Sequence, residues 1–220
     1  MIDGLLSLVA PHLCSGCGRV GSLLCTDCKS DIIQHPFSRC LVCQKPSNGK
    51  ICVKHHSPYA YAWVVGERRD TLQRLVGSFK FQNAKAGAQI LAQLLDERVP
   101  TLPTETIIVP IPTISSHIRE RGYDHAQLIA EHFAKRRKLP LQSLIERKTK
   151  SIQKNADKTA RKEQAQHAFH ITKPVSPTAT YLIIDDVVTT GATLQYASEL
   201  LKQAGASTIW VAALARQPLD

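Results

Sequence analysis

The sequence predicts an α/β fold, a doubly wound and mostly parallel sheet, preceded by a small metal-binding module. Three observations support this prediction. From residue 59 onward, short apolar runs alternate with amphipathic helical patterns. A buried-strand pattern at 181–184 leads through two acids and a Thr-Gly turn into another helical pattern. All seven cysteines lie between Cys14 and Cys52, which separates the front of the chain from the rest.

Composition narrows the functional classes. The sequence contains no run of 18 apolar residues, so we expect no membrane span. The segment 1–10 is mildly apolar but carries Asp3 and lacks a basic region, which makes it a poor signal peptide and favours a cytoplasmic protein. The net charge is +10, and residues 135–163 hold eleven basic against three acidic residues. This stretch is either a site for an anionic partner, nucleic acid or pyrophosphate, or a solvated helix face.

The first expected domain, residues 1–58, is a double zinc ribbon. Its cysteines fall in C-x2-C pairs, and the last of them is followed by a histidine. The simplest arrangement is sequential, with one zinc ion on each set of four ligands. The expected ligands are Cys14, Cys17, Cys25 and Cys28 for one ion, and Cys40, Cys43, Cys52 and His55 for the other. An interleaved pairing remains open at this stage.

Disulfides are the competing interpretation of these cysteines. The odd count, the repeated spacing and the lack of a secretion signal argue against them. Because such ribbons have little apolar sequence, metal binding substitutes for a core, and zinc here is expected to be structural. Several basic residues of the ribbon could also contact nucleic acid or a partner protein. They are Arg19, Lys29, Arg39, Lys45, Lys50 and Lys54.

The second expected domain, residues 59–220, contains the alternating pattern. Strands are expected at 59–66, 106–109 and 207–214, with weaker candidates at 144–146 and 168–171, besides the strand at 181–184. Helical stripes are expected over 72–80, over 90–95 before Pro100, and around 128–133. Pro110-Ile111-Pro112 directs the chain into a loop expected to carry Ser115, Ser116, His117, Arg119, Arg121 and Gly122.

The stretch 181–193 has the composition of a ligand site at the carboxyl edge of a parallel sheet. Backbone amides of the turn and of the following helix make an anion site, and Gly191 allows the backbone to close around it. The carboxylates of Asp185 and Asp186 suit hydroxyl donors or a divalent cation instead. A phosphate beside a diol describes a ribose 5-phosphate. An ordinary strand–helix junction would not need two acids and three threonines together.

Residues 181–193 resemble the phosphoribosyl pyrophosphate (PRPP) binding motif of type I phosphoribosyltransferases at every position except the bulkier Tyr181. Nearly the whole chain resembles the ComF family of competence-associated, phosphoribosyltransferase-like proteins. The matching pieces are the zinc ribbon, 79–81, 109–112, 119–123, Arg147 with Thr149, Gln153, Arg161 and Phe169, and the motif itself. The chain departs from the family at Asp124-His125, usually Asn-Gln, and at Gln164, usually Asn.

The resemblance implies a type I phosphoribosyltransferase-like sheet and roles for individual residues. Asp185 and Asp186 would hold the ribose hydroxyls, directly or through Mg²⁺, and would be the catalytic pair. The 5-phosphate cradle would be Thr189, Thr190, Gly191, Ala192 and Thr193, and Val187 would be a further PRPP-binding residue. Arg119 and Arg121 are candidates for the pyrophosphate, with Lys80 as a further one. His117 and His125 lack a carboxylate at a telling spacing and are interpreted as surface or packing residues.

Two functional hypotheses follow. The first is an enzyme that transfers a phosphoribosyl group from PRPP to an acceptor, with Mg²⁺ as cofactor and release of pyrophosphate. The second is a non-catalytic protein of DNA uptake and natural competence. It would handle single-stranded DNA with its zinc ribbon and basic face, alongside competence or DNA-processing proteins, with PRPP as ligand or regulator. The sequence shows no RNP-type aromatic pattern, so base-specific recognition is not expected.

Overall fold

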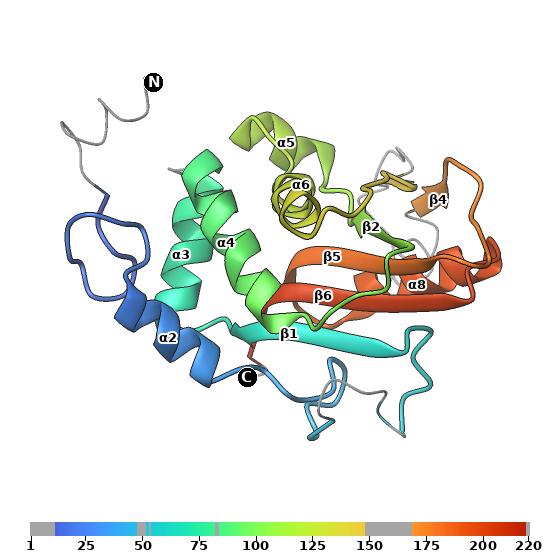
Figure 1. Cartoon of the computed structure of the whole chain (residues 1–220), viewed down its shortest axis with the longest axis horizontal. Helices are drawn as coiled ribbons and strands as arrows, with labels where there is room; N and C mark the ends of the chain where they lie inside the picture. The colour runs from blue at the N-terminus through green and yellow to red at the C-terminus, as the bar shows by residue number, and fades with distance from the viewer. Residues whose placement is uncertain (1–11, 48–51, 53, 82–83, 148–168, 219–220) are drawn as a thin grey trace, which may run out of the picture.

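A computed structural model describes residues 12–47, 52, 54–81, 84–147 and 169–218. The α/β prediction is confirmed: the central sheet has four strands in the order β1-β6-β5-β2, and all neighbouring pairs are parallel (Figure 1). The strands are β1 (Tyr61–Glu67), β2 (Thr106–Pro110), β5 (Thr180–Val188) and β6 (Thr208–Arg216). Their apolar, β-branched runs are buried on both faces, as parallel strands require.

The weaker strand candidates form a separate ribbon. Strands β3 (Ile145–Arg147) and β4 (Phe169–Ile171) pair with each other in antiparallel fashion, outside the main sheet. In this pair Arg147 lies opposite Phe169. The predicted contributions of Gln153, Arg161 and most of the basic stretch fall on the segment 148–168 and lie outside the described residues.

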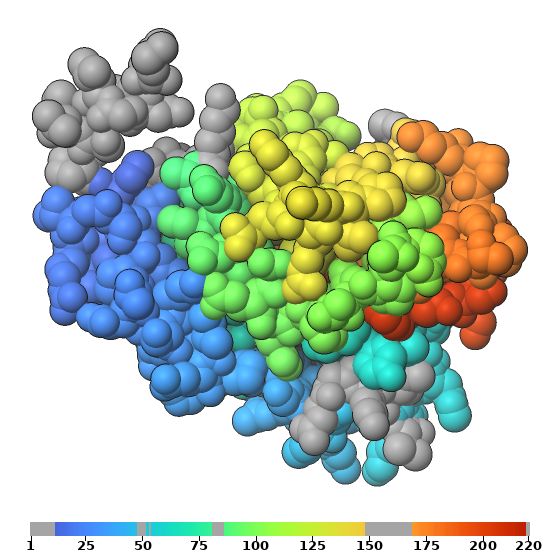
Figure 2. Space-filling model, viewed as in Figure 1, coloured from blue at the N-terminus to red at the C-terminus, as the bar shows by residue number. Residues whose placement is uncertain are grey.

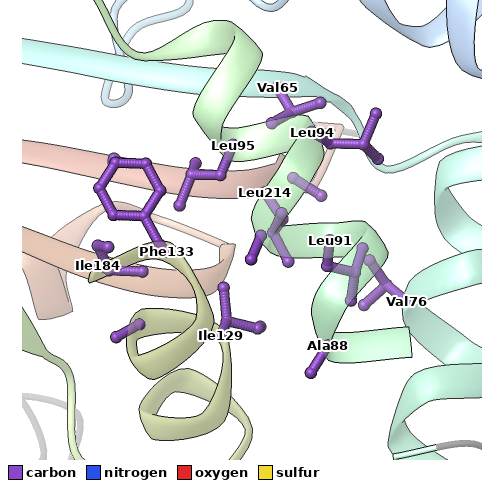
Figure 3. Close-up of a cluster of buried hydrophobic side chains, with 14 of the residues drawn as sticks. Val65, Val76, Ala88, Leu91, Leu94, Leu95, Ile129, Phe133, Ile184 and Leu214 are labelled. Atoms are coloured by element: carbon purple, nitrogen blue, oxygen red, sulfur yellow. The ribbon is translucent and has the colours of Figure 1, made fainter. Parts of the chain in front are cut away.

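Three helices cover one face of the sheet: α3 (Asp70–Phe81), α4 (Ala84–Arg98) and α6 (His125–Arg137). Their apolar stripes meet alternate strand residues in one buried cluster, in which Leu91, Leu95 and Phe133 pack against Ile184 and Leu214 (Figure 3). Helix α2 (Thr26–Gln34), which the sequence did not predict, joins this cluster through Ile32. Helix α2 therefore packs directly on α3 and α4 (Figure 2).

The opposite face is covered by α8 (Ala192–Gln203) and by part of the cysteine-rich region. Leu194, Ala197 and Leu201 of α8 share a buried cluster with Phe37 and Leu41. The cysteine-rich region is thus built into both faces of the sheet. Among the described residues, none of the helices combines the length and the apolar character needed to cross a bilayer.

One prediction in this part of the chain is wrong. Residues 115–121, expected as a loop, form the short helix α5 (Ser115–Arg121). The helix ends where Gly122 adopts a left-handed conformation (φ 82°) and donates its N–H to the Ile118 carbonyl. Seven residues carry too little apolar periodicity to signal a helix, so local hydrogen bonding decides the structure here.

Candidate functional site

The candidate anion site lies where β5 ends and α8 begins. Thr189 and Thr190 are exposed, Gly191 caps the helix with a left-handed φ of 81°, and Thr193 lies in the first turn. The Ala192 N–H reaches the Thr190 hydroxyl oxygen at 3.3 Å. The exposed hydroxyls of Thr189 and Thr190 lie directly before the amino-terminus of α8, where Ala192 and Thr193 are half-buried, and a helix amino-terminus with flanking hydroxyls can bind a phosphate.

The acid pair lies inside β5 rather than after it, because the strand continues to Val188. Asp185 is only 9% exposed, and its Oδ1 accepts the Asp186 N–H at 2.8 Å. Asp186 in turn accepts the Val187 N–H through Oδ1 at 2.7 Å. The strand holds both carboxylates at the carboxyl edge of the sheet, directly before the anion site.

The two carboxyl groups titrate in opposite directions. Burial raises the pKa of Asp185 well above 3.8, and the neighbouring Asp186 charge adds to that rise. Burial also acts to raise the pKa of Asp186, but the Lys80 ammonium, the Val187 N–H and His125 together outweigh it and lower that pKa overall. The Lys80 Nζ lies 2.6 Å from the Asp186 Oδ2, and both side chains are mostly buried. The two neighbouring carboxyl groups therefore differ in acidity, and Asp186 is the stronger acid.

Lys80 reaches the site from the last turn of α3. The helix end is held in place because the Tyr123 hydroxyl donates to the Phe79 carbonyl. His125 is 1% exposed and packs edge-on against the Phe79 and Tyr123 rings. Burial lowers its pKa, with Asp186 opposing that effect. His125 is therefore a packing residue that supports Lys80, and its place beside the acid pair was not foreseen.

The two candidate arginines lie on α5. Arg119 is exposed, whereas Arg121 is half-buried with its Nη1 3.4 Å from His125 Nδ1. Arg121 therefore shares the environment of Lys80 and Asp186, because His125 interacts electrostatically with all three. His117 is half-buried on the same helix.

Two polar residues near the site were missed as contributors to it. Asp124 caps α6 at the Gln127 N–H (3.0 Å) and accepts both the N–H (3.0 Å) and the hydroxyl (2.8 Å) of Thr113. It thereby fastens the loop after β2. Arg147 donates to the Pro112 carbonyl at 2.8 Å and interacts electrostatically with Asp185. The departure from the family pattern at Asp124 could have signalled that this residue caps α6, since aspartate is a strong N-cap.

The cysteine-rich region forms two candidate metal centres. The ligand atoms of Cys14, Cys17, Cys25 and Cys28 gather within 4.8 Å of one another, and so do those of Cys40, Cys43, Cys52 and His55. Four sulfurs, or three sulfurs and one imidazole nitrogen, are donor sets that zinc prefers. These groupings match the sequential arrangement, so the region could hold two zinc ions.

One thiol in each cluster has a lowered pKa. Burial acts to raise the pKa of Cys14, but N–H groups of Cys17 and Cys25 outweigh it and lower that pKa to about 6. Interaction with His55 lowers the pKa of Cys52 to about 6. Each cluster therefore contains a thiol predisposed to the thiolate form that coordinates zinc.

Within the basic stretch, the described residues Arg136 and Arg137 hold helices together. Arg137 binds the Asp96 carboxylate and also donates to the carbonyls of Val99 (2.5 Å) and Pro100 (3.0 Å). Arg136 contacts Asp96 as well, at 3.1 Å. These two arginines fix α6 to α4, whereas Lys135 and Lys138 are exposed. The basic residues from 148 to 162 lie outside the described residues.

Comparison with known proteins gives two kinds of match. A family model described as the phosphoribosyl transferase domain matches residues 82–220. Over 227 aligned residues the chain is 30% identical to competence protein F of Haemophilus influenzae, covering 97% of this chain and 94% of that protein. It is 28% identical to DNA utilization protein YhgH of Salmonella typhi (95% and 99% covered) and 24% identical to competence protein ComFC of Bacillus subtilis (91% and 75%).

Proposed function

Because this chain belongs to the ComF family and carries a phosphoribosyl transferase domain over residues 82–220, we propose that it binds PRPP with Mg²⁺ and transfers its phosphoribosyl group. One observation carries the proposal. A mostly buried acid pair at the end of β5 is followed at once by an open turn and the amino-terminus of α8. Carboxylates for a diol and an anion site for a phosphate therefore lie side by side.

In this proposal different residues bind different parts of PRPP. Residues 189–193 hold the 5-phosphate, with Val187 at their entry. Asp185 and Asp186 hold the ribose hydroxyls, directly or through Mg²⁺, which would also neutralise charge on the departing oxygens. The fixed negative charge of Asp186 favours the positive charge that grows on the ribose as pyrophosphate leaves. Lys80, Arg121 and Arg119 are the cations available to pyrophosphate oxygens.

The binding step can be tested by calorimetry with PRPP and Mg²⁺. We expect wild-type protein to bind and the double variant Asp185→Asn, Asp186→Asn to lose binding. A matched control is Asp27→Asn, Asp31→Asn, which removes two exposed carboxylates of α2 and should leave affinity unchanged. Binding that the first double variant retains would refute the assignment of the site.

The transfer step needs a separate measurement. Pyrophosphate release from PRPP should appear with at least one acceptor of a broad panel of nucleobases, amines and related nucleophiles. The same Asp185→Asn, Asp186→Asn variant gives the background. Release no greater than this background across the panel, with PRPP binding intact, would show a binding protein rather than an enzyme.

A second candidate function is the handling of single-stranded DNA. It is favoured by the names of the relatives, which refer to competence and DNA utilization, and by the exposed Lys135 and Lys138. Binding should weaken as salt rises, and Lys135→Gln, Lys138→Gln should reduce both the affinity and the salt dependence. Arg136 and Arg137 are unsuitable targets, because their loss would also separate α6 from α4.

A further inference from the structure

The second cysteine cluster lies directly against residues 189–193, which the proposed function makes the phosphate turn. Leu41, between the ligands Cys40 and Cys43, is 2% exposed, and its carbonyl faces Gly191. A Cβ atom placed on Gly191 would lie 3.5 Å from the Leu41 oxygen and 3.6 Å from its Cβ. The backbone of the turn therefore rests on the loop that carries two of the metal ligands.

A buried arginine joins the two loops. Arg216, the last residue of β6, is 0% exposed and pairs in register with Val188 at the end of β5. Its Nε donates to the Leu41 carbonyl at 3.1 Å, and its Nη1 donates to the carbonyls of Val188 (3.4 Å) and Gln217 (2.5 Å). One rigid guanidinium thus contacts the cysteine loop and the residue that immediately precedes the turn.

The surroundings of Arg216 explain why a charged group is retained there. Burial lowers the pKa of Arg216, and an electrostatic interaction with Cys40 opposes that effect. A buried guanidinium needs several acceptors in fixed directions, and these are the carbonyls of Leu41 in the cysteine loop, Val188 at the end of β5 and Gln217, the next residue in the chain. Displacing the Cys40–Cys43 loop would remove one acceptor and leave a donor unsatisfied, so the loop and the turn are expected to move together.

We propose that Arg216 is a positioning residue for the phosphate turn and links the metal state of the Cys40, Cys43, Cys52, His55 cluster to PRPP affinity. This inference rests on the proposed PRPP site and adds a means of regulating it. With zinc bound, the Cys40–Cys43 loop presents the Leu41 carbonyl to Arg216, which holds the end of β5 and the turn ready for phosphate. Without zinc, Arg216 loses that acceptor and the turn is no longer preorganised.

Arg98 provides a matched control. Its Nε donates to the Val64 carbonyl at 2.9 Å and its Nη2 to the Phe37 carbonyl at 3.3 Å. It therefore ties the cysteine-rich region to the sheet by the same chemistry, but through β1 instead of the turn. Arg98→Met and Arg216→Met should both lower thermal stability. Only Arg216→Met should weaken PRPP binding, by about tenfold or more, because lost preorganisation is a cost of binding.

Amide hydrogen exchange of residues 189–193 without PRPP is the second readout. Faster exchange is expected in Arg216→Met than in Arg98→Met, with Arg216→Lys intermediate because it keeps one donor group. This readout separates the inference from the proposed function. If wild-type protein fails to bind PRPP, the proposed function fails, while exchange still tests the positioning role of Arg216. Equal exchange and equal affinity in the two methionine variants would overturn it.

The metal link is tested with one ligand variant from each cluster, Cys43→Ser and Cys17→Ser. Zinc content should show the loss of one ion in each case. Cys43→Ser should then accelerate exchange at 189–193 and weaken PRPP binding more than Cys17→Ser does. If Arg216→Met does not fold, this pair together with Arg216→Lys still decides the matter. Equal effects of the two cysteine variants would show that zinc acts only through general stability.

Discussion

The two cysteine clusters have similar spacing in sequence but different positions in the fold. The first cluster docks on α3, where the Arg74 side chain donates to the carbonyls of Ser15 (2.5 Å) and Gly16 (3.1 Å). The second cluster docks on the other face of the sheet, where Leu41 meets Gly191 and Arg216. The first cluster therefore supports the helix that carries Lys80, and the second cluster supports the phosphate turn.

The two cysteine clusters therefore share a spacing motif but support different structural elements. Each cluster supports one side of the same candidate site: Lys80 extends from α3 to Asp186, and the turn after β5 follows the same acid pair. A zinc ribbon that only added stability could dock anywhere. Here both clusters pack on the elements that position the cations and the anion site.

The two clusters should differ most in how much stability they lose on substitution of the residue before the second cysteine of their first C-x2-C pair. This residue is Gly16 in the first cluster and Val42 in the second. A Cβ on Gly16 would lie 2.4 Å from the Cys28 Sγ and 2.9 Å from the Thr71 hydroxyl. Gly16→Ala should therefore displace a metal ligand and cost several kcal/mol, since metal binding is the folding energy of such ribbons. Val42→Ala should have a small effect because a side chain already fits there.

Zinc content and thermal denaturation check this prediction. Gly16→Ala should lose one of two zinc ions and melt well below wild type, and Val42→Ala should retain both ions. Full zinc content in Gly16→Ala would mean that the first knuckle tolerates a Cβ and that the two clusters are equivalent.

The second largest effect concerns the α3 side of the site. Lys80→Met should destabilise the protein by about 3 kcal/mol at neutral pH, because it leaves the buried Asp186 carboxylate without its cation. Because the pKa of Asp186 is lowered in the folded protein, the ionised carboxylate stabilises the fold at any pH above the usual pKa of 3.8. This stabilisation is lost as the pH falls from 3.8 through the lowered pKa. The deficit of the variant should therefore shrink in acid. Urea denaturation from pH 8 down to pH 2 spans this window, and a deficit independent of pH over that range would contradict the ion pair.

Much of the fold could be predicted because strand and helix periodicities are local. The PRPP-like motif was also recognisable, since its residues are contiguous from 181 to 193. Helix α5 was missed because Ser115–Arg121 has little apolar patterning. The role of Arg216 could not be predicted, because its acceptor Leu41 is 175 residues away in sequence. The lone charged residue at the end of the buried strand β6 was the available signal.

Substitution of Asp185 and of Asp186 should change the stability of the protein in opposite directions. The raised pKa of Asp185 means that the folded protein keeps this proton where the unfolded chain releases it. Stability is then lost as pH rises from 3.8 through the raised pKa. Asp185→Asn should therefore stabilise the protein by about 1 kcal/mol or more at pH 7–8, with the gain vanishing towards pH 4.

The control for this prediction is the neighbouring acid. Asp186→Asn should destabilise the protein at neutral pH, because it removes the partner of Lys80. Melting temperatures across pH 4–8 compare the two variants. The same sign for both would show that the acids share one environment instead of differing through the α3 cation.

The smallest expected effect lies at the first docking contact. Arg74 is exposed, so Arg74→Met should cost about 1 kcal/mol or less although it removes both hydrogen bonds to the first cluster. Zinc content should stay at two ions, because the ligands are untouched. Arg69→Met is the matched control, since it removes an exposed arginine that pairs with Glu67 and not with the ribbon. Faster amide exchange in residues 14–28 is expected only for Arg74→Met. Equal exchange in the two variants would show that the first cluster is held on α3 by its apolar contacts alone.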